Sequence, residues 1–106
     1  MDKNAVVEIV DRFRRGLEAR GIRPQKVILY GSHATGVATA GSDIDVVVIS
    51  SDFSGKGYWE RVEVLSDVIY RIFEPLDAVA LTPDEWEGGE SCVVEFARNG
   101  EVVYAA

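Results

Sequence analysis

Three aspartates are the clearest candidates for chemistry in this 106-residue sequence. Asp43 and Asp45 lie two residues apart at the start of an apolar segment, and Asp77 is an isolated acid inside a second apolar segment. Because residues i and i+2 of a strand point to the same face, the first two carboxylates are expected to project side by side. Two such charges repel each other unless a shared proton or a bound cation relieves the repulsion.

A divalent cation would satisfy these carboxylates and supply a function. Mg²⁺ prefers carboxylate oxygens and keeps several water ligands, which substrate phosphates can replace. Three convergent carboxylates can hold two metal ions, which stabilise the attacking and the leaving oxygen in phosphoryl transfer. The pattern therefore predicts Asp43, Asp45 and Asp77 as catalytic residues and as ligands of Mg²⁺, with two ions expected.

The dipeptide Gly31-Ser32 offers a second feature that phosphate chemistry needs. It follows a short apolar run and precedes a segment that is expected to begin a short helix. A small turn there lets backbone N–H groups and the Ser32 hydroxyl approach a phosphate, and the helix dipole favours the negative charge. Gly36 and Gly41 keep the following loop free of bulky side chains.

Hydrophobic periodicity predicts the elements that must position these residues. A first helix, which ends near Gly21, carries an apolar stripe at helical spacing: Val6, Ile9, Val10, Phe13 and Leu17. A second helix over 58–73 carries another: Trp59, Val62, Leu65, Ile69 and Ile72. Strands rich in β-branched residues are predicted over 26–30, 43–50 and 76–81. The unbroken apolar run of the second strand indicates burial on both faces.

The C-terminal third leaves one alternative open. Thr82 and Pro83 predict the start of a short helix, because threonine caps helices well and proline fits their first position. Segment 92–98 followed by Asn99-Gly100 fits a helix leading to a strand over 101–104 or a type I′ hairpin, and we favour the helix. The element order indicates one domain over 1–106 of the α/β (α+β) class, with a small mixed sheet flanked by helices.

The combined motif resembles a known family. Gly31-Ser32, ten intervening residues, Asp43-Ile44-Asp45 and a later Asp77 resemble the nucleotidyltransferase superfamily of DNA polymerase beta, and the small size resembles its minimal (MNT) branch. The resemblance covers nearly the whole chain. It implies a polymerase beta-like nucleotidyltransferase core in which the three aspartates bind Mg²⁺ and Gly31 and Ser32 bind the nucleotide triphosphate.

The resemblance also implies a reaction and a partner. Minimal nucleotidyltransferases are commonly paired with a helical HEPN-domain protein, as the antitoxin of a toxin–antitoxin couple. We therefore expect metal-dependent transfer of AMP from ATP to a hydroxyl of that partner, with Asp77 also placed to accept the proton. The alternative is a catalytically weak or inactive antitoxin of the same fold that acts by binding its partner.

One position departs from the family pattern. Minimal members commonly carry an arginine three residues after the serine, where this sequence has Thr35. A missing cation beside the developing phosphate charge weakens transition-state stabilisation. The missing arginine leaves three alternatives: slow turnover, another phosphate clamp such as Lys56, or a fold that is retained without activity.

Two further enzyme motifs and a purely structural role fit these residues less well. Haloacid-dehalogenase-like phosphatases also use Asp-x-Asp, but there the nucleophile follows a complete apolar strand, whereas here the apolar residues come after Asp43. A P-loop is excluded because no Gly-Lys-Ser/Thr follows the glycine turn. A solvated edge strand would account for Asp43 and Asp45, but it would account for neither Gly31-Ser32 nor Asp77.

Composition narrows the setting of the protein. With 47% hydrophobic and 27% charged residues, the chain is typical of folded globular proteins. The net charge of −7 makes it a poor candidate for gripping a nucleic-acid backbone, although the basic residues concentrate in 1–26, where a solvated helix face is expected. No apolar run is long enough for a bilayer, so a cytoplasmic protein, which could form an oligomer, is the expectation. We expect Cys92 to be a small buried hydrophobe and His33 to be partly exposed without a catalytic role.

Overall fold

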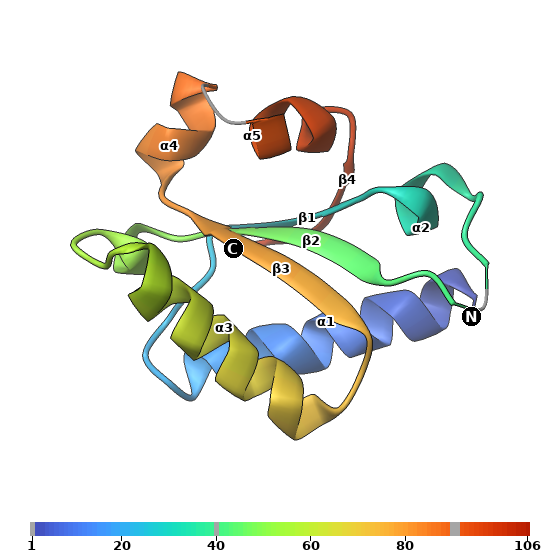
Figure 1. Ribbon diagram of the computed structural model, residues 1–106, viewed down its shortest axis with the longest axis horizontal. Coiled ribbons are helices and arrows are strands. Elements are labelled where there is room, and N and C mark those ends of the chain that lie inside the picture. Colours follow the sequence, from blue (N-terminus) through green and yellow to red (C-terminus); the bar gives the residue numbers. More distant parts are fainter. Residues whose placement is uncertain (1, 40, 90–91) are drawn as a thin grey trace.

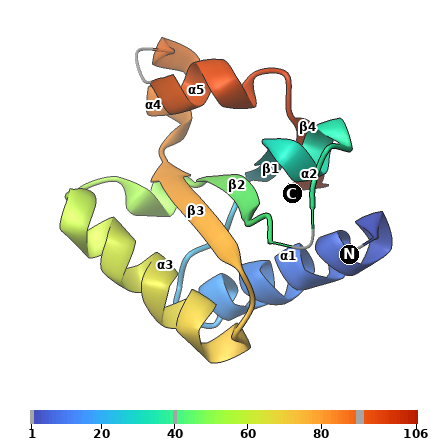
Figure 2. The ribbon, with the colours of Figure 1, turned by 45° about the vertical axis from the view of Figure 1, so that its right-hand side comes forward.

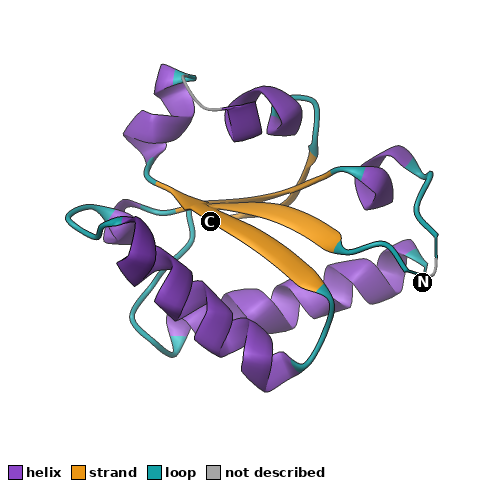
Figure 3. Ribbon diagram, viewed as in Figure 1, coloured by secondary structure: helices purple, strands orange, loops and turns teal. Residues whose placement is uncertain are grey.

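The computed structural model describes residues 2–39, 41–89 and 92–106, which form a four-stranded mixed sheet with helices on both faces (Figures 1 and 3). The strands are β1 (Lys26–Tyr30), β2 (Ile44–Ile49), β3 (Leu76–Leu81) and β4 (Glu101–Ala105). The helices are α1 (Lys3–Glu18), α2 (Ser32–Thr35), α3 (Tyr58–Ile72), α4 (Pro83–Gly88) and α5 (Cys92–Ala97), with a 3-10 turn η1 at Ser51–Phe53. The predicted fold class is confirmed.

The strand order β3-β2-β1-β4 places the two motif-bearing strands next to each other. β1 runs antiparallel to β2 and to β4, whereas β2 and β3 are parallel. A parallel pair needs a long crossover connection, which η1 and α3 provide here. In this order β3 and β4 are the edge strands of the sheet.

The two faces of the sheet are covered by different helices (Figure 2). α1 and α3 pack on one face, and the apolar stripe of α1 is buried there as predicted. On the other face a smaller cluster joins the sheet to α5: Ile28, Val47, Ile49, Leu81, Val94 and Ala97. β2 is therefore buried from both sides, as its apolar run indicated, and Val46, Val47 and Val48 have no exposed surface.

β2 begins one residue later than predicted. Its first residue is Ile44, whose N–H donates to the Pro75 carbonyl over 2.7 Å and opens the ladder to β3. Asp43 thus lies in the loop before the strand, and the strand-face argument for its direction does not apply to it. α1 ends as predicted at Gly21, which has a φ of 87°: the N–H groups of Gly21 and Ile22 donate to the carbonyls of Glu18 and Leu17 and close the helix.

The second predicted helix forms, but the direction predicted for Trp59 is wrong. Trp59 is 76% exposed, while Leu65 and Val68 are the buried residues of α3. At about 100° per residue, a position six residues before Leu65 lies about 120° around the helix from it. Trp59 therefore points away from the sheet.

The C-terminal segment adopts the favoured alternative, a helix followed by a strand. α5 leads through Gly100 into β4, which pairs with β1. The prediction for Cys92 is wrong: as the first residue of α5 it is exposed, because Val94 and Ala97 are the positions that face the sheet.

The basic residues of the first helix are largely neutralised by acids rather than simply solvated. Arg14 donates to Asp11 and Glu18 and also lies 4.3 Å from the centre of the Tyr104 ring. Hydrogen bonds from Arg14 and Arg15 hold the pKa of Asp11 below its usual value. Such pairing leaves little free positive charge for a polyanion.

No helix within the described ranges is long and apolar enough to cross a bilayer.

The packing of α1 on α3 depends on a glycine. A Cβ on Gly16 would lie 2.6 Å from Cγ1 of buried Val68. We expect Gly16→Ala to destabilise the protein by about 1 kcal/mol, because overpacking outweighs the gain in helix propensity. In a Val68→Ala background the same change should stabilise. Urea unfolding of the four proteins measures this, and an equal effect in both backgrounds would contradict it.

Candidate active site

Two of the predicted site residues meet in the sheet. Asp45 and Asp77 are directly opposed in the parallel pair of β2 and β3. Residues in register on neighbouring strands project to the same face of the sheet. Here it is the face that also carries Val47 and Val79, on the side of α5 rather than of α1 and α3. The structure thus brings together two carboxylates that lie 32 positions apart in the sequence.

These carboxylates repel each other, and among the described residues neither has a cationic partner in an ion pair. Burial raises the pKa of Asp45, the charges of Asp77 and Asp43 raise it further, and His33 opposes them. Among residues 2–39, 41–89 and 92–106, no ion pair involves Asp43, Asp45 or Asp77. A group of negative charges without a cation is an arrangement that a positive ligand would stabilise.

Tyr30 extends the row of polar groups across a third strand. It is the antiparallel partner of Asp45, so Tyr30, Asp45 and Asp77 share one face of β1, β2 and β3. Burial and then the charges of Asp45 and Asp77 raise the pKa of the Tyr30 phenol, which therefore stays protonated and able to donate. In the sequence, the single hint of this role is the position of Tyr30 directly before Gly31.

Asp43 is near this pair but outside the strand. It is exposed, in the loop that leads into β2, and its charge contributes to the raised pKa of Asp45. Within the described part of the chain, no three His, Cys, Asp or Glu side chains are already grouped to hold a metal ion. The three-aspartate site stays a prediction, with Asp45 and Asp77 as its adjacent members.

Gly31 places the predicted phosphate turn directly against Asp45. Its φ of 73° and ψ of −155° lie in a region that only glycine adopts readily. A Cβ at this position would lie 2.5 Å from Oδ2 of Asp45. Ser32 begins α2 immediately afterwards, and the first N–H groups of a helix have no partner within it. The turn and the carboxylates therefore border the same space.

The donor set fits a divalent metal. Carboxylate oxygens are the ligands that Mg²⁺ prefers, and no side-chain cation of the described residues occupies the charges. The glycine at position 31 lets the backbone approach the Asp45 carboxylate more closely than any other residue could. Asp43, Asp45 and Asp77 are thus the residues that would hold the metal.

His33 has a structural function that the sequence did not reveal, and its predicted exposure is wrong. It is 8% exposed, and its Nε2 lies 3.2 Å from the carbonyl oxygen of Ser42. Because Ser42 precedes Asp43, this contact ties α2 to the end of the loop that carries Asp43. A histidine so placed helps to position a candidate ligand.

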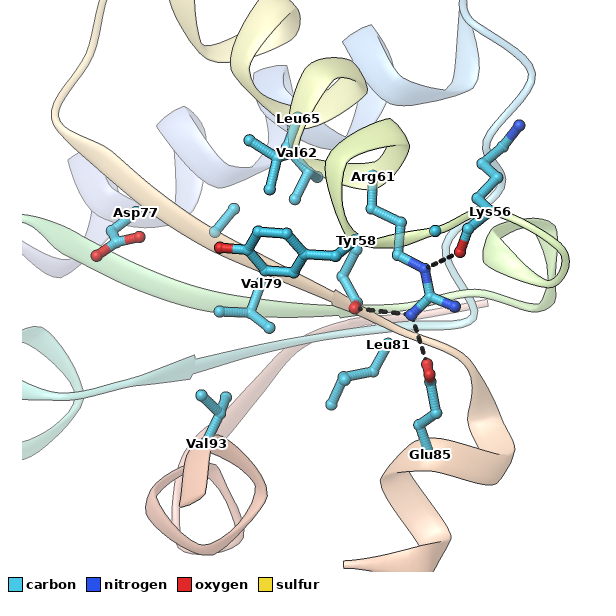
Figure 4. A pocket seen from close by; sticks show the side chains of 13 residues that line it. Lys56, Tyr58, Arg61, Val62, Leu65, Asp77, Val79, Leu81, Glu85 and Val93 are labelled. Atoms are coloured by element: carbon cyan, nitrogen blue, oxygen red, sulfur yellow. Dashed lines mark hydrogen bonds and ion pairs between the residues drawn. The ribbon is translucent and has the colours of Figure 1, made fainter. Parts of the chain in front are cut away.

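Neither Thr35 nor Lys56 supplies a cation near the turn. The Thr35 hydroxyl is 3.3 Å from the carbonyl oxygens of both Gly31 and Ser32, so it donates back into its own helix. Lys56 lines a pocket that Asp77 also lines, but the two lie at opposite ends of it (Figure 4). The position of Lys56 gives no support to its being an alternative phosphate clamp.

The family of the chain follows from comparison with known proteins. The model of the nucleotidyltransferase domain family matches residues 10–87, which contain all five predicted site residues. The chain therefore belongs to the nucleotidyltransferase domain family, and the resemblance seen in its motif is confirmed. Its class is that of nucleotidyltransferase enzymes, which generally use divalent metal ions.

Solved structures share the fold. One is a candidate nucleotidyltransferase from Sulfolobus solfataricus, with a TM-score of 0.67 and 16% identity over 92% of this chain and 78% of that chain. Another is a toxin–antitoxin structure with AMP-PNP, with a TM-score of 0.64 and 18% identity over 91% and 73%. A third is a candidate nucleotidyltransferase with a TM-score of 0.54 and 25% identity over 90% and 92%. Comparison with curated protein sequences gave no match.

The burial of Asp45 and its repulsion by Asp77 and Asp43 predict that removing its charge stabilises the metal-free fold. The raised pKa means that ionised Asp45 costs stability. This cost is absent below the pKa of the carboxyl in the unfolded chain, ordinarily 3.8, and develops as the pH rises through the folded-state pKa. Asp45→Asn should therefore raise the urea midpoint at pH 7 in EDTA, and the gain should vanish below about pH 4. A lower midpoint at pH 7 would contradict the repulsion.

The close approach of Gly31 to Asp45 predicts a specific effect of adding one methyl group. Gly31→Ala should cost about 1–3 kcal/mol through backbone strain and should displace the Asp45 carboxylate. Gly36→Ala is the matched control, because Gly36 also has a positive φ of 81°, but a Cβ added there would meet no described atom within 4 Å. Carboxyl ¹³C titration of Asp45 should change only in Gly31→Ala. An identical titration in both variants would show that the carboxylate is not in contact with the turn.

Proposed function

We propose that this protein transfers AMP from ATP to a hydroxyl group of a partner protein in a Mg²⁺-dependent reaction, as the antitoxin of a toxin–antitoxin pair. The observation that carries the proposal is the registered pair Asp45 and Asp77, without a cationic partner among the described residues and with the Gly31 turn against it. Metal-binding carboxylates beside a polyphosphate-binding turn are the two components that nucleotidyl transfer requires.

The reaction is a substitution at the α-phosphorus of ATP. The acceptor oxygen forms a bond to that phosphorus, the bond from phosphorus to the bridging oxygen breaks, and pyrophosphate leaves. The hydroxyl proton passes to Asp77, which would act as the general base. Asp77 suits this task because its side chain is exposed beside Asp45, at the edge of the sheet where an acceptor can approach.

The remaining site residues bind and orient. Asp43 and Asp45 would hold two Mg²⁺ ions, with Asp77 as a further ligand of the catalytic one. When bound, the ions supply the positive charge that neutralises the phosphates and favours attack. Gly31 and Ser32 would anchor the β- and γ-phosphates, and Tyr30, protonated at neutral pH, could donate to a phosphate or ribose oxygen.

The partner is proposed to be a helical HEPN-type protein. The similarity of the fold to a toxin–antitoxin structure with AMP-PNP supports both a nucleotide and a protein partner for this chain. ATP is the favoured nucleotide on the same ground. The two candidate nucleotidyltransferases of similar fold support the chemical class without indicating an acceptor.

The proposal predicts that transfer depends on the aspartates. With α-labelled ATP, Mg²⁺ and a helical HEPN-type protein from a reading frame next to that of this chain, the label should move to the partner, whose mass should rise by one AMP. Asp43→Asn and Asp77→Asn should lower the rate at least about 100-fold, because each removes a ligand, and Asp77→Asn also removes the base. Labelled partner quantified on a gel, with mass spectrometry, gives both readouts.

Controls separate lost chemistry from lost structure. Asp84→Asn is the matched control, because Asp84 is an exposed acid outside the site, in the first turn of α4. Mg²⁺ should raise the melting temperature of the parent chain and of Asp84→Asn but not of Asp45→Asn. Transfer at the parent rate by both Asp43→Asn and Asp77→Asn would refute the mechanism.

A second function, inhibition of the partner by binding alone, is favoured by one observation. At the position where minimal members commonly carry an arginine, this chain has Thr35, whose hydroxyl donates to carbonyls at the start of its own helix. No side-chain cation of the described residues pairs with the aspartates. Tight association with the partner and no mass gain in ATP and Mg²⁺ would support this function over the enzyme.

A further inference from the structure

We propose that the groove between α3 and the outer edge of β3 binds an extended, positively charged segment of the protein that accepts the nucleotide. This inference rests on the proposed function, because it describes how an acceptor reaches Asp77. The α3–β3 groove consists of two adjoining pockets of about 650 and 490 Å³. They share five lining residues: Tyr58, Val62, Leu65, Asp77 and Ala78.

The wall of the groove is an exposed apolar surface of α3. Tyr58 is 70% and Tyr70 is 80% exposed, although both are large aromatic residues. Val62 and Leu65 continue the wall between them. Figure 4 shows Tyr58 over the middle of the larger pocket and Asp77 at one end. An exposed apolar surface that leads to a candidate catalytic residue offers a macromolecular substrate a place to pack.

The floor of the groove is a sheet edge with unused backbone groups. Two backbone hydrogen bonds show which residues of this strand face β2. The N–H of Ser50 donates to the carbonyl of Leu81, and the N–H of Ile44 donates to the carbonyl of Pro75. The odd-numbered residues of β3 therefore direct their backbone groups toward β2. The even-numbered residues direct theirs outward. Arg61 Nη1 donates to the Ala80 carbonyl over 3.3 Å and closes one end of this edge.

Ala78 is therefore the open part of the edge. No described residue forms a hydrogen bond to its outward N–H and C=O groups. Such groups are satisfied by a chain that adds as a further strand, whereas a helix has no backbone groups left to offer along its length. This favours an extended segment over a docked helix.

The negative charge around the groove favours a positively charged segment. Residues 58–88, which form α3, β3 and α4, contain eight acids and only two basic residues, Arg61 and Arg71. Both arginines are already paired, Arg61 with Glu85 over 2.6 Å and Arg71 with Asp67 over 3.8 Å. The surface around the groove attracts a basic segment and repels a second copy of this chain, whose net charge is −7.

The added strand would deliver its side chains to the site. Alternate residues of a strand paired with Ala78 project to the face that carries Asp77 and Asp45. A serine, threonine or tyrosine hydroxyl at such a position lies beside these carboxylates. It can then attack the α-phosphorus of ATP, release pyrophosphate and give its proton to Asp77.

Peptide binding without ATP tests the groove separately from the chemistry. The probe is a dye-labelled nonapeptide of alternating lysine and valine with a central tyrosine, and its counterpart replaces each lysine with glutamate. Fluorescence polarisation should show binding of the lysine peptide and at least tenfold weaker binding of the glutamate peptide. No binding of the lysine peptide, or equal binding of the two, would overturn the proposal.

Variants locate the binding surface. Ala78→Pro removes an outward N–H without breaking the ladder to β2, and Tyr70→Ser removes part of the wall without altering the strand. Each should weaken binding of the lysine peptide at least tenfold. Phe96→Ser is the matched control, because Phe96 is 74% exposed on α5 and does not line the groove. The proposal would be overturned if both Tyr70→Ser and Ala78→Pro bound the lysine peptide as tightly as the parent. If only Ala78→Pro did so, the segment would bind as a helix and not as a strand.

Further readouts separate the ways in which the two proposals can fail. If the lysine peptide binds in the groove but no acceptor is ever labelled, docking holds and the proposed function fails. If the partner is labelled at the parent rate by both Ala78→Pro and Tyr70→Ser, the chemistry holds and the groove is not its acceptor site. Sedimentation of the protein alone should show a monomer, and a dimer that Ala78→Pro dissociates would identify a second copy as the occupant.

Discussion

The parallel pairing of β2 and β3 is the constraint on which the site depends. It sets Asp45 opposite Asp77, so that burial and then the charge of Asp77 raise the pKa of Asp45 and make its ionised form costly. The fold can sustain this repulsion because β2 is buried on both faces, with Val46, Val47 and Val48 fully covered. Apolar burial of this extent stabilises the strand by several kcal/mol and leaves the two acids little freedom to separate. The stability of the core thus preserves an electrostatically unfavourable arrangement that a metal-bound nucleotide would reverse.

The segment between β1 and β2 brings the other components to the same place. Gly31 adopts a backbone conformation that suits glycine alone and thereby lies against Asp45, while His33 is buried and holds the carbonyl of Ser42, next to Asp43. One short helix therefore links the Gly31 turn to the loop that carries the exposed Asp43. The local structure explains the glycine at position 31, because a Cβ there would lie 2.5 Å from Oδ2 of Asp45.

Charge is distributed differently over α1 and over the surface formed by α3, β3 and α4. The arginines of α1 are paired with acids, whereas the surface of α3, β3 and α4 keeps an excess of acids around a groove whose two pockets both reach Asp77. Edge strands are usually protected from pairing by charge, by prolines or by covering helices. Here Arg61 protects the edge near Ala80 and leaves Ala78 open, beside the candidate catalytic residue. Selective protection of this kind is what a substrate-binding edge requires.

The sequence by itself determined the identity of the elements and the family. Apolar periodicity places α1, α3 and the strands, and the interval between Gly31-Ser32 and Asp43-Ile44-Asp45 indicates nucleotidyltransferases, because both are local patterns of spacing. Only the tertiary structure decided which side chains meet. The registration of Asp45 with Asp77, the alignment of Tyr30 with both and the burial of His33 depend on strand order and on how the helices pack. Those are set by packing between segments far apart in the chain, and no local pattern of residues encodes them.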